Sequence, residues 1–416
     1  MRIAIIGSGI AGLTAAYLLS RKHEITLFEA QGRLGGHTAT IDIEEDGRQL
    51  AIDTGFIVYN DWTYPNFIRL LNELGIESQP TSMGFSVRCD REGFEYAGNN
   101  LNSLFSQRSN LLNAGHWRML WDIVRFNRGA LRDWREGRLN EGLTLGEYLP
   151  ANGYSEEFAS RYLVPMGSAI WSASMSQMLE FSVSFFVRFF FNHGLLNIVR
   201  RPQWRVIKGG SRSYIAPLTA PYKDGIRLST KVCSVRRTAS GVDLLTSTGE
   251  RHSYDGVVFA CHSDQALQCL GDATPQEQDV LGAIPYAYNK VVLHTDTALL
   301  PRRKLSWSSW NYRLRAERDQ LPVLTYNMNI LQSLRTEKTY CVTLNAEERI
   351  NPEKILAHFE YAHPQFSVAG SRAQQQWAHI SGVNHTWFCG AYWGNGFHED
   401  GVNSALRVAE SLGVHW

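Results

Sequence analysis

Glycines near the N-terminus of this chain have the spacing of a diphosphate-binding turn. Residues 2–6 form an apolar run that leads into Gly7, Gly9 and Gly12, and residues 13–19 show the pattern of an amphipathic helix. In such a unit the first glycine allows the tight turn, the second lets a pyrophosphate approach the backbone, and the third lets the helix pack on the strand. The helix N-terminus adds free N–H groups and a positive dipole end.

An acidic residue follows at the distance expected for ribose binding. Residues 24–28 form a second apolar strand that ends in Glu29. In a βαβ unit, an acid about 20 residues after the glycines can bind ribose hydroxyls. The glycines and this acid together predict a dinucleotide-binding site.

A second glycine-rich loop then distinguishes between dinucleotides. Arg33, Gly35, Gly36 and His37 follow the acid, and FAD, unlike NAD, must be led from its adenine to a distant isoalloxazine ring. The run resembles the E-x-x-x-R-x-G-G signature of the flavin amine oxidase superfamily, which includes phytoene desaturases, protoporphyrinogen oxidases and UDP-galactopyranose mutases. Residues 51–56 resemble its next landmark, a strand ending in D-x-G beside the flavin. A simple turn with glycines at positive φ is the alternative interpretation.

The C-terminal residues resemble the closing flavin motif of the same superfamily. We expect a strand over 387–390, a glycine-punctuated loop and a helix over 400–409. In the superfamily this helix directs its N-terminus at the pyrimidine end of the flavin, where reduced flavin carries negative charge. The resemblance therefore implies that the backbone N–H groups around Gly401 and Val402 stabilise that charge.

Some features depart from the superfamily pattern. Ala391 stands where relatives carry an acid that contacts the ribityl chain, so we expect that contact from Asn395 or Glu399. His37 stands where many amine oxidases have arginine. The S-G-G-C-Y-type run that carries covalent flavin is absent, which predicts non-covalent FAD.

The resemblance implies that Val232 contacts the adenine through its backbone. The residues expected to bind FAD are Gly7, Gly9, Ile10, Ala11, Gly12, Glu29, Ala30, Arg33, Gly35, Gly36, His37, Thr54, Gly55, Phe56, Val232, Gly390, Ala391, His398, Asp400, Gly401 and Val402.

Composition narrows the class of protein. The 416 residues allow two domains, the formal net charge is +1, and basic and acidic residues are interleaved, so we expect no nucleic-acid partner. The six cysteines have no metal-ligand spacing, which predicts no metal site and a reducing, cytoplasmic location. Glycines interrupt the apolar N-terminal run, so we do not expect this run to be a signal peptide, which needs a continuous apolar core. The aromatic run 181–191 contains a charge and is too short to span a membrane, although peripheral membrane contact stays open.

The order of motifs predicts interleaved domains. The expected fold class is α/β: a Rossmann-like FAD-binding domain of GR2 type interleaved with an α+β substrate domain. Glycines become fewer from about residue 80, and apolar residues then recur at helical spacing, which predicts a mostly helical insertion up to about 200. The predicted boundaries are 1–75, 200–270 and 381–416 for the FAD-binding domain, and 76–199 and 271–380 for the substrate domain.

Catalysis by a flavin requires few protein groups, because the cofactor supplies the reactivity. Lys290 resembles the amine oxidase lysine that is bonded through water to flavin N5, and a surface lysine at a strand start is the alternative. Aromatic residues are expected to line a pocket for an apolar or extended substrate, although tryptophans are often core residues. The expected substrate-site residues are Trp171, Phe186, Trp307, Trp310 and Tyr326.

Three segments resemble a narrower, bacterial amine-oxidase-like branch: 162–172, 293–296 and 307–312. Members of this branch are often associated with cyclopropane-fatty-acid-synthase-like enzymes, which suggests a lipid or fatty-acyl substrate. The sequence therefore predicts an FAD-dependent oxidase or desaturase that moves a hydride from a hydrophobic substrate to flavin N5. The alternatives are a redox-neutral isomerase or mutase, an amine oxidase proper, and a non-catalytic flavin-binding protein that handles lipids.

Overall fold

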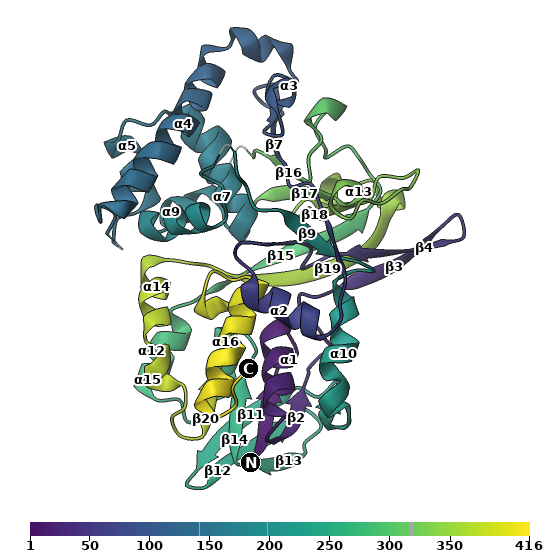
Figure 1. The fold of residues 1–416 in the computed structure, drawn as a ribbon, viewed down its shortest axis with the longest axis vertical. Coiled ribbons are helices and arrows are strands. Elements are labelled where there is room, and N and C mark those ends of the chain that lie inside the picture. The colour runs from purple at the N-terminus through teal and green to yellow at the C-terminus, as the bar shows by residue number, and fades with distance from the viewer. Residues whose placement is uncertain (141, 198, 316–319) are drawn as a thin grey trace.

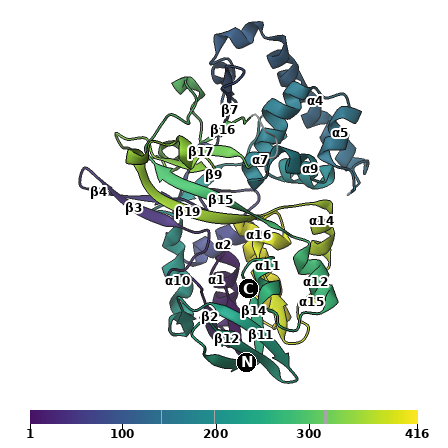
Figure 2. The same cartoon turned by 180° about the vertical axis from the view of Figure 1, so that it is seen from behind.

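The molecule has two stacked halves, of which the lower contains the predicted diphosphate-binding turn and the upper contains most of the expected substrate segments (Figures 1 and 2). The computed structural model describes residues 1–140, 142–197, 199–315 and 320–416. The N-terminus and the five-stranded sheet lie at the bottom of Figure 1, and the helices of the insertion lie at the top. A seven-stranded sheet lies between them.

The lower half is built on a parallel sheet of order β10-β2-β1-β14-β20. A parallel sheet needs both faces covered. Helices cover one face, and a three-stranded antiparallel sheet with shorter helices covers the other. The strands are β1 (Arg2–Ile6), β2 (Glu24–Phe28), β10 (Ile226–Arg227), β14 (Gly256–Phe259) and β20 (Thr386–Phe388), and the antiparallel sheet is β11 (Val232–Thr238), β12 (Gly241–Thr246) and β13 (Arg251–Tyr254). The helices are α1 (Ile10–Leu19), α2 (Pro65–Glu73), α10 (Ile215–Thr219), α11 (Ser263–Cys269), α12 (Pro275–Gly282), α14 (Val368–Gln375), α15 (Trp377–Ile380) and α16 (His398–Ser411).

Helix α1 differs from the amphipathic helix that the sequence predicts. Nine of its ten residues are buried, because α16, α10 and the sheet pack around it. A helix that is apolar all round belongs in the core. The diphosphate-binding turn is thus anchored at the centre of the lower half.

The middle layer is a mixed sheet of order β19-β15-β18-β17-β16-β7-β8. Its long pair β15·β19 brings residues about 70 positions apart into register, with Asn289 opposite Tyr361 and Ala287 opposite His363. The strands are β7 (Phe85–Cys89), β8 (Phe94–Ala97), β15 (Tyr286–His294), β16 (Trp310–Arg313), β17 (Val323–Asn327), β18 (Cys341–Leu344) and β19 (Ile355–Pro364). Smaller sheets connect the layers: β3 (Thr40–Glu45) with β4 (Arg48–Asp53), and β9 (Trp204–Ile207) with β5 (Tyr59–Asn60) and β6 (Ser78–Pro80).

The insertion forms a helical block with an aromatic core. Most of the run 181–191 lies in α9 (Val183–Asn192), most of whose side chains are buried among other phenylalanines and Trp171. This run is therefore core rather than a membrane-facing surface. The other helices are α3 (Leu101–Leu104), α4 (Ala114–Arg135), α5 (Leu145–Ala151), α6 (Glu156–Phe158), α7 (Val164–Trp171) and α8 (Met175–Leu179), and α13 (Met328–Leu331) follows β17.

The structure differs from the sequence-based expectations in two places, one in the type of element and one in the assignment of segments to the two halves. Residues 85–97 form β7 and β8 of the middle sheet rather than helix, and α12, α14 and α15 pack in the core of the lower half although they fall within 271–380. Both differences arise from pairings between segments far apart in sequence. In the part of the chain that the structure describes, no helix combines the length and apolarity needed to cross a bilayer.

Candidate active site

The first glycine turn leaves room where a diphosphate is expected. Gly7 has a φ of +105°, and a Cβ on Gly12 would lie 2.0 Å from the Gly7 carbonyl oxygen, so both positions require glycine. A Cβ on Gly9, in contrast, would meet no atom of the described residues within 4 Å. Helix α1 begins directly after Gly9, at Ile10 and Ala11, without a side-chain cap. Its first N–H groups therefore face an open approach for an anion.

The predicted ribose acid lies beside this turn. The Glu29 carboxylate accepts hydrogen bonds from Ser8 N–H (3.0 Å), Ser8 Oγ (2.5 Å) and Gln31 N–H (2.8 Å). These bonds orient the carboxylate at the ends of β1 and β2, next to exposed Ala30. Val232 is buried in the same apolar cluster as Ile6 and Phe28, at these strand ends.

The second glycine loop packs directly on the first. Gly35 N–H donates to the Ser8 carbonyl (3.0 Å), and a Cβ on Gly36 would lie 3.2 Å from Gly9 Cα. The Arg33 guanidinium donates to the carbonyls of Gly36 (2.8 Å) and Thr38 (3.1 Å), which fixes the turn. The two loops therefore form one continuous surface that leads from the α1 N-terminus to His37.

The D-x-G segment lies against His37. A Cβ on Gly55 would lie 2.1 Å from the His37 carbonyl oxygen, and Phe56 N–H donates to that oxygen at 2.8 Å. Thr54 Oγ1 and the Tyr361 hydroxyl are 3.0 Å apart, so a hydrogen bond joins this segment to β19 of the middle sheet. The end of the cofactor path is thus fixed to the substrate half.

Three neutral histidines gather at this junction. The His37 ring centroid is 6.2 Å from that of His262 and 5.3 Å from that of His363, and Tyr361 lies 5.1 Å away. We call His37, His262 and His363 the histidine cluster. Burial, with a smaller effect of neighbouring charge, lowers the pKa of His37 and His262 to about 4 and of His363 to about 3. All three are uncharged at neutral pH.

The last helix closes the site. The His398 ring stacks on Phe56 with centroids 3.4 Å apart, and its Nε2 lies 3.1 Å from Thr38 Oγ1 and 3.2 Å from the Tyr214 hydroxyl. Burial holds the His398 pKa well below its usual value. Helix α16 begins at His398, two residues before the predicted start.

This earlier start changes the expected roles of the following residues. Gly401 N–H donates to the Phe397 carbonyl inside the helix, so the free N–H groups are those of the first turn, around His398, rather than those of Gly401 and Val402. The Asp400 carboxylate accepts from Phe397 N–H (2.9 Å), and burial raises the Asp400 pKa to about 6.

The expected ribityl contact from Glu399 is not available in this arrangement. Both Glu399 carboxylate oxygens accept backbone N–H bonds at the start of α2, from Asn66 (3.0 Å) and Phe67 (2.8 Å). Gly390 N–H donates to Ser404 Oγ at 3.0 Å, which fixes the turn that carries Ala391. Glu399 is thus a structural link between α16 and α2.

Lys290 is not brought to the histidine cluster. Its side chain is exposed, whereas the neighbouring Asn289 is buried on the other face of β15, where its Nδ2 lies 3.0 Å from His363 Nδ1. Successive strand residues point to opposite faces of a sheet. The catalytic role expected for Lys290 stays a prediction. Two other β15 side chains contact the cluster: Asn289, and Tyr286, whose ring stacks on His262 with centroids 4.4 Å apart.

The expected substrate residues separate into two groups. Trp310 and Tyr326 pair across β16 and β17 with rings 5.1 Å apart, and both pack on the same apolar cluster as Tyr361. Trp310 Nε1 is buried without a hydrogen-bond partner among the described residues. These two side chains lie on the cofactor side of the sheet.

The other three expected residues lie elsewhere. Phe186 is fully buried and stacks on Phe190 (4.1 Å), and Trp171 is buried against Phe189, both within the helical core. Trp307 Nε1 donates to the Pro301 carbonyl (2.8 Å). Aromatic spacing in the sequence could not separate these core positions from pocket positions, because both kinds are apolar.

Comparison with known proteins decides the family. The family model described as flavin containing amine oxidoreductase matches residues 10–344. The chain belongs to this family. The match begins directly after Gly9 and spans the second glycine loop, the insertion and most of the middle sheet. FAD is therefore the cofactor, as predicted from the resemblance.

Individual curated proteins match this chain at low identity or over only a short part of their length. An L-amino acid dehydrogenase of Synechocystis sp. is 24% identical over 260 residues, which cover 59% of this chain and 53% of the relative. The chain spans about half the length of this curated relative, and 9% of a snake L-amino-acid oxidase (Pseudechis australis) that it matches over 47 residues.

Two solved structures are similar over nearly their whole length. A cyclohexylamine oxidase from Brevibacterium oxydans has a TM-score of 0.68 at 17% identity, with 99% of each chain covered. A CLA-producing fatty acid isomerase from P. acnes has a TM-score of 0.68 at 15% identity, with 97% of this chain and 96% of that chain covered. The likeness concerns the fold, and it confirms the predicted α/β class.

The residues of this family member fit FAD. The open space at Gly9 and the uncapped α1 N-terminus suit a pyrophosphate, and Glu29 lies beside them for a ribose. His37 Nε2 is buried without a hydrogen-bond partner among the described residues. Such an atom is costly unless a ligand satisfies it, as a bound flavin would do. Groups of three or more residues able to hold a metal ion are absent from the described residues.

Sequence reasoning missed part of the site. His363, Tyr361 and Asn289 join it through the β15·β19 pairing, and nothing in their local sequence marks them. His262 carries a usable signal, because it follows β14 in a parallel sheet, and ligands bind at the carboxyl ends of such strands.

Proposed function

We propose that this protein is an FAD-dependent oxidoreductase that takes a hydride from an apolar, lipid or fatty-acyl substrate. The observation that carries the proposal is the neutral character of the site. The histidine cluster is uncharged near neutral pH, and its ring neighbours Tyr361 and Tyr286 are also neutral. A protonated amine would be better served by a carboxylate in such a poorly solvated place.

The side chains have separate tasks in this proposal. A bound FAD would supply the hydride acceptor, its N5 atom. His37 offers its free Nε2 to the cofactor or the substrate, and Asn289 holds the His363 ring through Nδ1. Trp310 and Tyr326 provide an apolar wall that excludes water and orients an extended substrate. Phe56 and His398 form a stacked pair that keeps the α16 N-terminus in place for the pyrimidine end.

The setting of the reaction is also part of the proposal. The fold is shared with a fatty acid isomerase, which supports a lipid substrate. A peripheral contact with membranes is a further part of the proposal. All six cysteines are free, which supports the cytoplasmic location, because reducing compartments keep thiols unpaired. The FAD is held without a covalent bond in this proposal.

The test is anaerobic absorbance of the FAD-loaded protein during addition of fatty acids, phospholipids or simple amines. Bleaching of the long-wavelength flavin band by a lipid, with a dehydrogenated product, is the expected result. Bleaching by amines alone would establish an amine oxidase proper and overturn the lipid assignment. Trp310→Ala should weaken the response to lipid at least ten-fold, while Trp307→Ala, outside this wall, serves as the matched control.

A redox-neutral isomerase is the second candidate, because the fatty acid isomerase shares this fold. In that case prior reduction of the flavin would be required, and lipid double bonds would move without oxygen consumption or net bleaching. Retention of unchanged lipid under both conditions would instead identify a non-catalytic lipid-handling flavoprotein.

A further inference from the structure

An apolar patch is exposed on the helical insertion, whose helices α3 and α4 lie at the end of the molecule farthest from the five-stranded sheet (Figures 1 and 2). Leu111 and Leu112 lie in the 3-10 turn at 108–112, and Trp117 and Trp121 lie one turn apart on α4. Their exposed fractions are 48%, 93%, 50% and 68%. We call these four residues the α4 patch. Large apolar side chains gathered on one surface mark an interaction site.

The rest of the exposed α4 face is basic. Helix α4 contains five arginines and two aspartates, a formal charge of +3. The two aspartates, Asp122 and Asp133, are buried, whereas Arg128, Arg132 and Arg135 are exposed. The positive charge of this helix therefore faces solvent, beside the tryptophans.

Three of the arginines line a surface cavity next to Trp121. The cavity has a volume of about 440 Å³ and is lined by Arg125, Arg128 and Arg132 together with Trp121 and Tyr154. Its acidic lining residue, Asp133, is buried and pairs with Arg132 (3.5 Å). Arg125 is held in place, since its Nη2 donates to the Gly153 carbonyl (2.6 Å) and its guanidinium lies 4.4 Å from the Tyr154 ring centroid. A fixed guanidinium group among others suits a phosphate, which accepts several N–H bonds.

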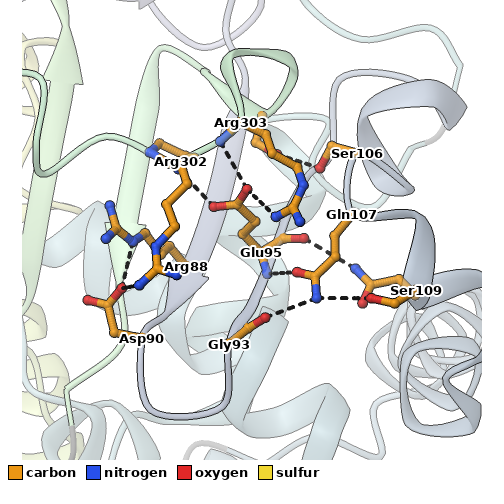
Figure 3. A network of polar contacts seen from close by, with 12 residues as sticks. Arg88, Asp90, Gly93, Glu95, Ser106, Gln107, Ser109, Arg302 and Arg303 are labelled. Atoms are coloured by element: carbon orange, nitrogen blue, oxygen red, sulfur yellow. Dashed lines mark hydrogen bonds and ion pairs between the residues drawn. The ribbon is translucent and has the colours of Figure 1, made fainter.

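One acidic side chain near the patch, Glu95, is neutralised inside the protein (Figure 3). Buried Glu95 on β8 accepts from the backbone N–H groups of Arg302 (2.9 Å) and Arg303 (3.0 Å), and from Arg303 Nη1 (2.7 Å). Gln107 accepts from Glu95 N–H (3.0 Å) and donates to Ser109 Oγ (3.1 Å). This network ties the segment before the α4 patch to the middle sheet and offers no free carboxylate at Glu95 to repel anions.

We propose that the α4 patch and the arginine cavity dock on the surface of an anionic membrane. Tryptophan and leucine side chains would enter the headgroup boundary, where tryptophan is favoured, and arginines would bind lipid phosphates. The charge complementarity selects a lipid surface rich in anionic headgroups as the occupant. The aromatic run of α9 takes no part, because it is core. Docking at this end leaves the cofactor half in water (Figure 1).

The test measures co-sedimentation of the full FAD-loaded chain with vesicles, without turnover, so its result is independent of the proposed reaction. Binding to vesicles of phosphatidylcholine with 30% phosphatidylglycerol should be at least ~10-fold tighter than to phosphatidylcholine alone, and should fall steeply at 0.5 M salt. A Trp117→Ala/Trp121→Ala variant and, separately, Arg128→Gln should each lose most of this binding, with unchanged flavin absorbance and circular dichroism.

Matched controls come from exposed residues elsewhere in the chain. Trp62→Ala, on the loop before α2, and Arg251→Gln, on β13, should bind the vesicles like the wild type. Equal binding to both kinds of vesicle, or equal losses in the control variants, would overturn the proposal. The proposal would also be overturned if the protein bound inorganic phosphate in the arginine cavity but did not bind anionic vesicles. That result would show a site for a soluble anion.

Discussion

A substitution at Gly9 should change FAD affinity without changing the stability of the fold. Its backbone has an ordinary φ of −66°, and an added Cβ would meet no atom of the described residues within 4 Å. Gly9→Ala should therefore change the free energy of unfolding of the apoprotein by less than about 0.5 kcal/mol. The methyl group occupies the approach of the pyrophosphate, so FAD affinity should fall at least ~10-fold, about 1.4 kcal/mol. Denaturant unfolding and flavin-fluorescence titration measure the two quantities.

Gly12 provides the contrasting variant. Its Cβ would lie 2.0 Å from the Gly7 carbonyl oxygen, so Gly12→Ala must move backbone and should destabilise even the apoprotein, by about 1–3 kcal/mol. If Gly9→Ala also destabilised the apoprotein while its FAD affinity stayed unchanged, the pyrophosphate would have to lie elsewhere.

A second comparison at the residue scale concerns neighbours on β15. Asn289→Ala removes the contact with His363 Nδ1 and leaves a buried ring unsatisfied, so flavin reduction by an active substrate should slow about 10-fold or more (about 1.4 kcal/mol). Lys290→Met, on the exposed face, should change this rate less than about two-fold. Stopped-flow absorbance measures both rates. A large loss with Lys290→Met alone would restore the lysine role that the sequence predicts.

Local and long-range signals explain what the sequence could reveal at this scale. Gly7, Gly9 and Gly12 are recognisable because their roles depend on spacing within one turn. His363 reaches the site only because β19 pairs with β15, a strand about 70 residues earlier in the chain. No pattern in the sequence around His363 predicts this pairing.

At the scale of elements, Glu399 links two helices. Its carboxylate accepts the N–H groups of Asn66 and Phe67 at the start of α2, so α16 caps a helix that is more than 300 residues earlier in the chain. Glu399→Ala should lower the free energy of unfolding by about 1–2 kcal/mol, as for the loss of an N-cap. Glu399→Gln keeps one acceptor oxygen and should cost less. Urea denaturation of the two variants gives the comparison.

The same link explains an error at the level of elements. The sequence offers Asn395 or Glu399 as the ribityl contact, but the helix starts at His398 and turns the Glu399 side chain toward α2. If Glu399→Ala left stability unchanged and lowered only FAD affinity, the ribityl interpretation would be right after all. The spacing of apolar residues predicts that helix α16 exists, but it does not predict the first residue of the helix. That first residue determines which partner each side chain faces.

The whole molecule should show a pH dependence dominated by buried histidines. Burial lowers the pKa of His294 to about 4, and the same holds for His193 and the histidine cluster at about 3–4. A group whose pKa is lower in the folded state gives stability above its unfolded pKa of about 6.5, and this stability is lost as pH falls toward 4. Asp53 and Asp400, raised to about 6, act in the opposite direction, since their contribution is lost as pH rises through 6.

The balance of these groups predicts a fall in stability on acidification. Near pH 5 the five histidines bind more protons in the unfolded chain than in the folded one, and the two aspartates bind more in the folded chain. The difference at the histidines is the larger, so unfolding takes up protons. The free energy of unfolding should therefore decrease between pH 6.5 and 4.5, by about 1.4 kcal/mol per pH unit for each net proton. His294 is fully buried between Thr343 Oγ1 (2.8 Å) and Asp296 N–H (3.0 Å), so His294→Asn should lower stability at pH 7 and flatten the slope. Urea denaturation of the apoprotein at several pH values gives both slopes. A wild-type curve that rises on acidification over this range would show that the two aspartates, and not the histidines, control the pH response of the fold.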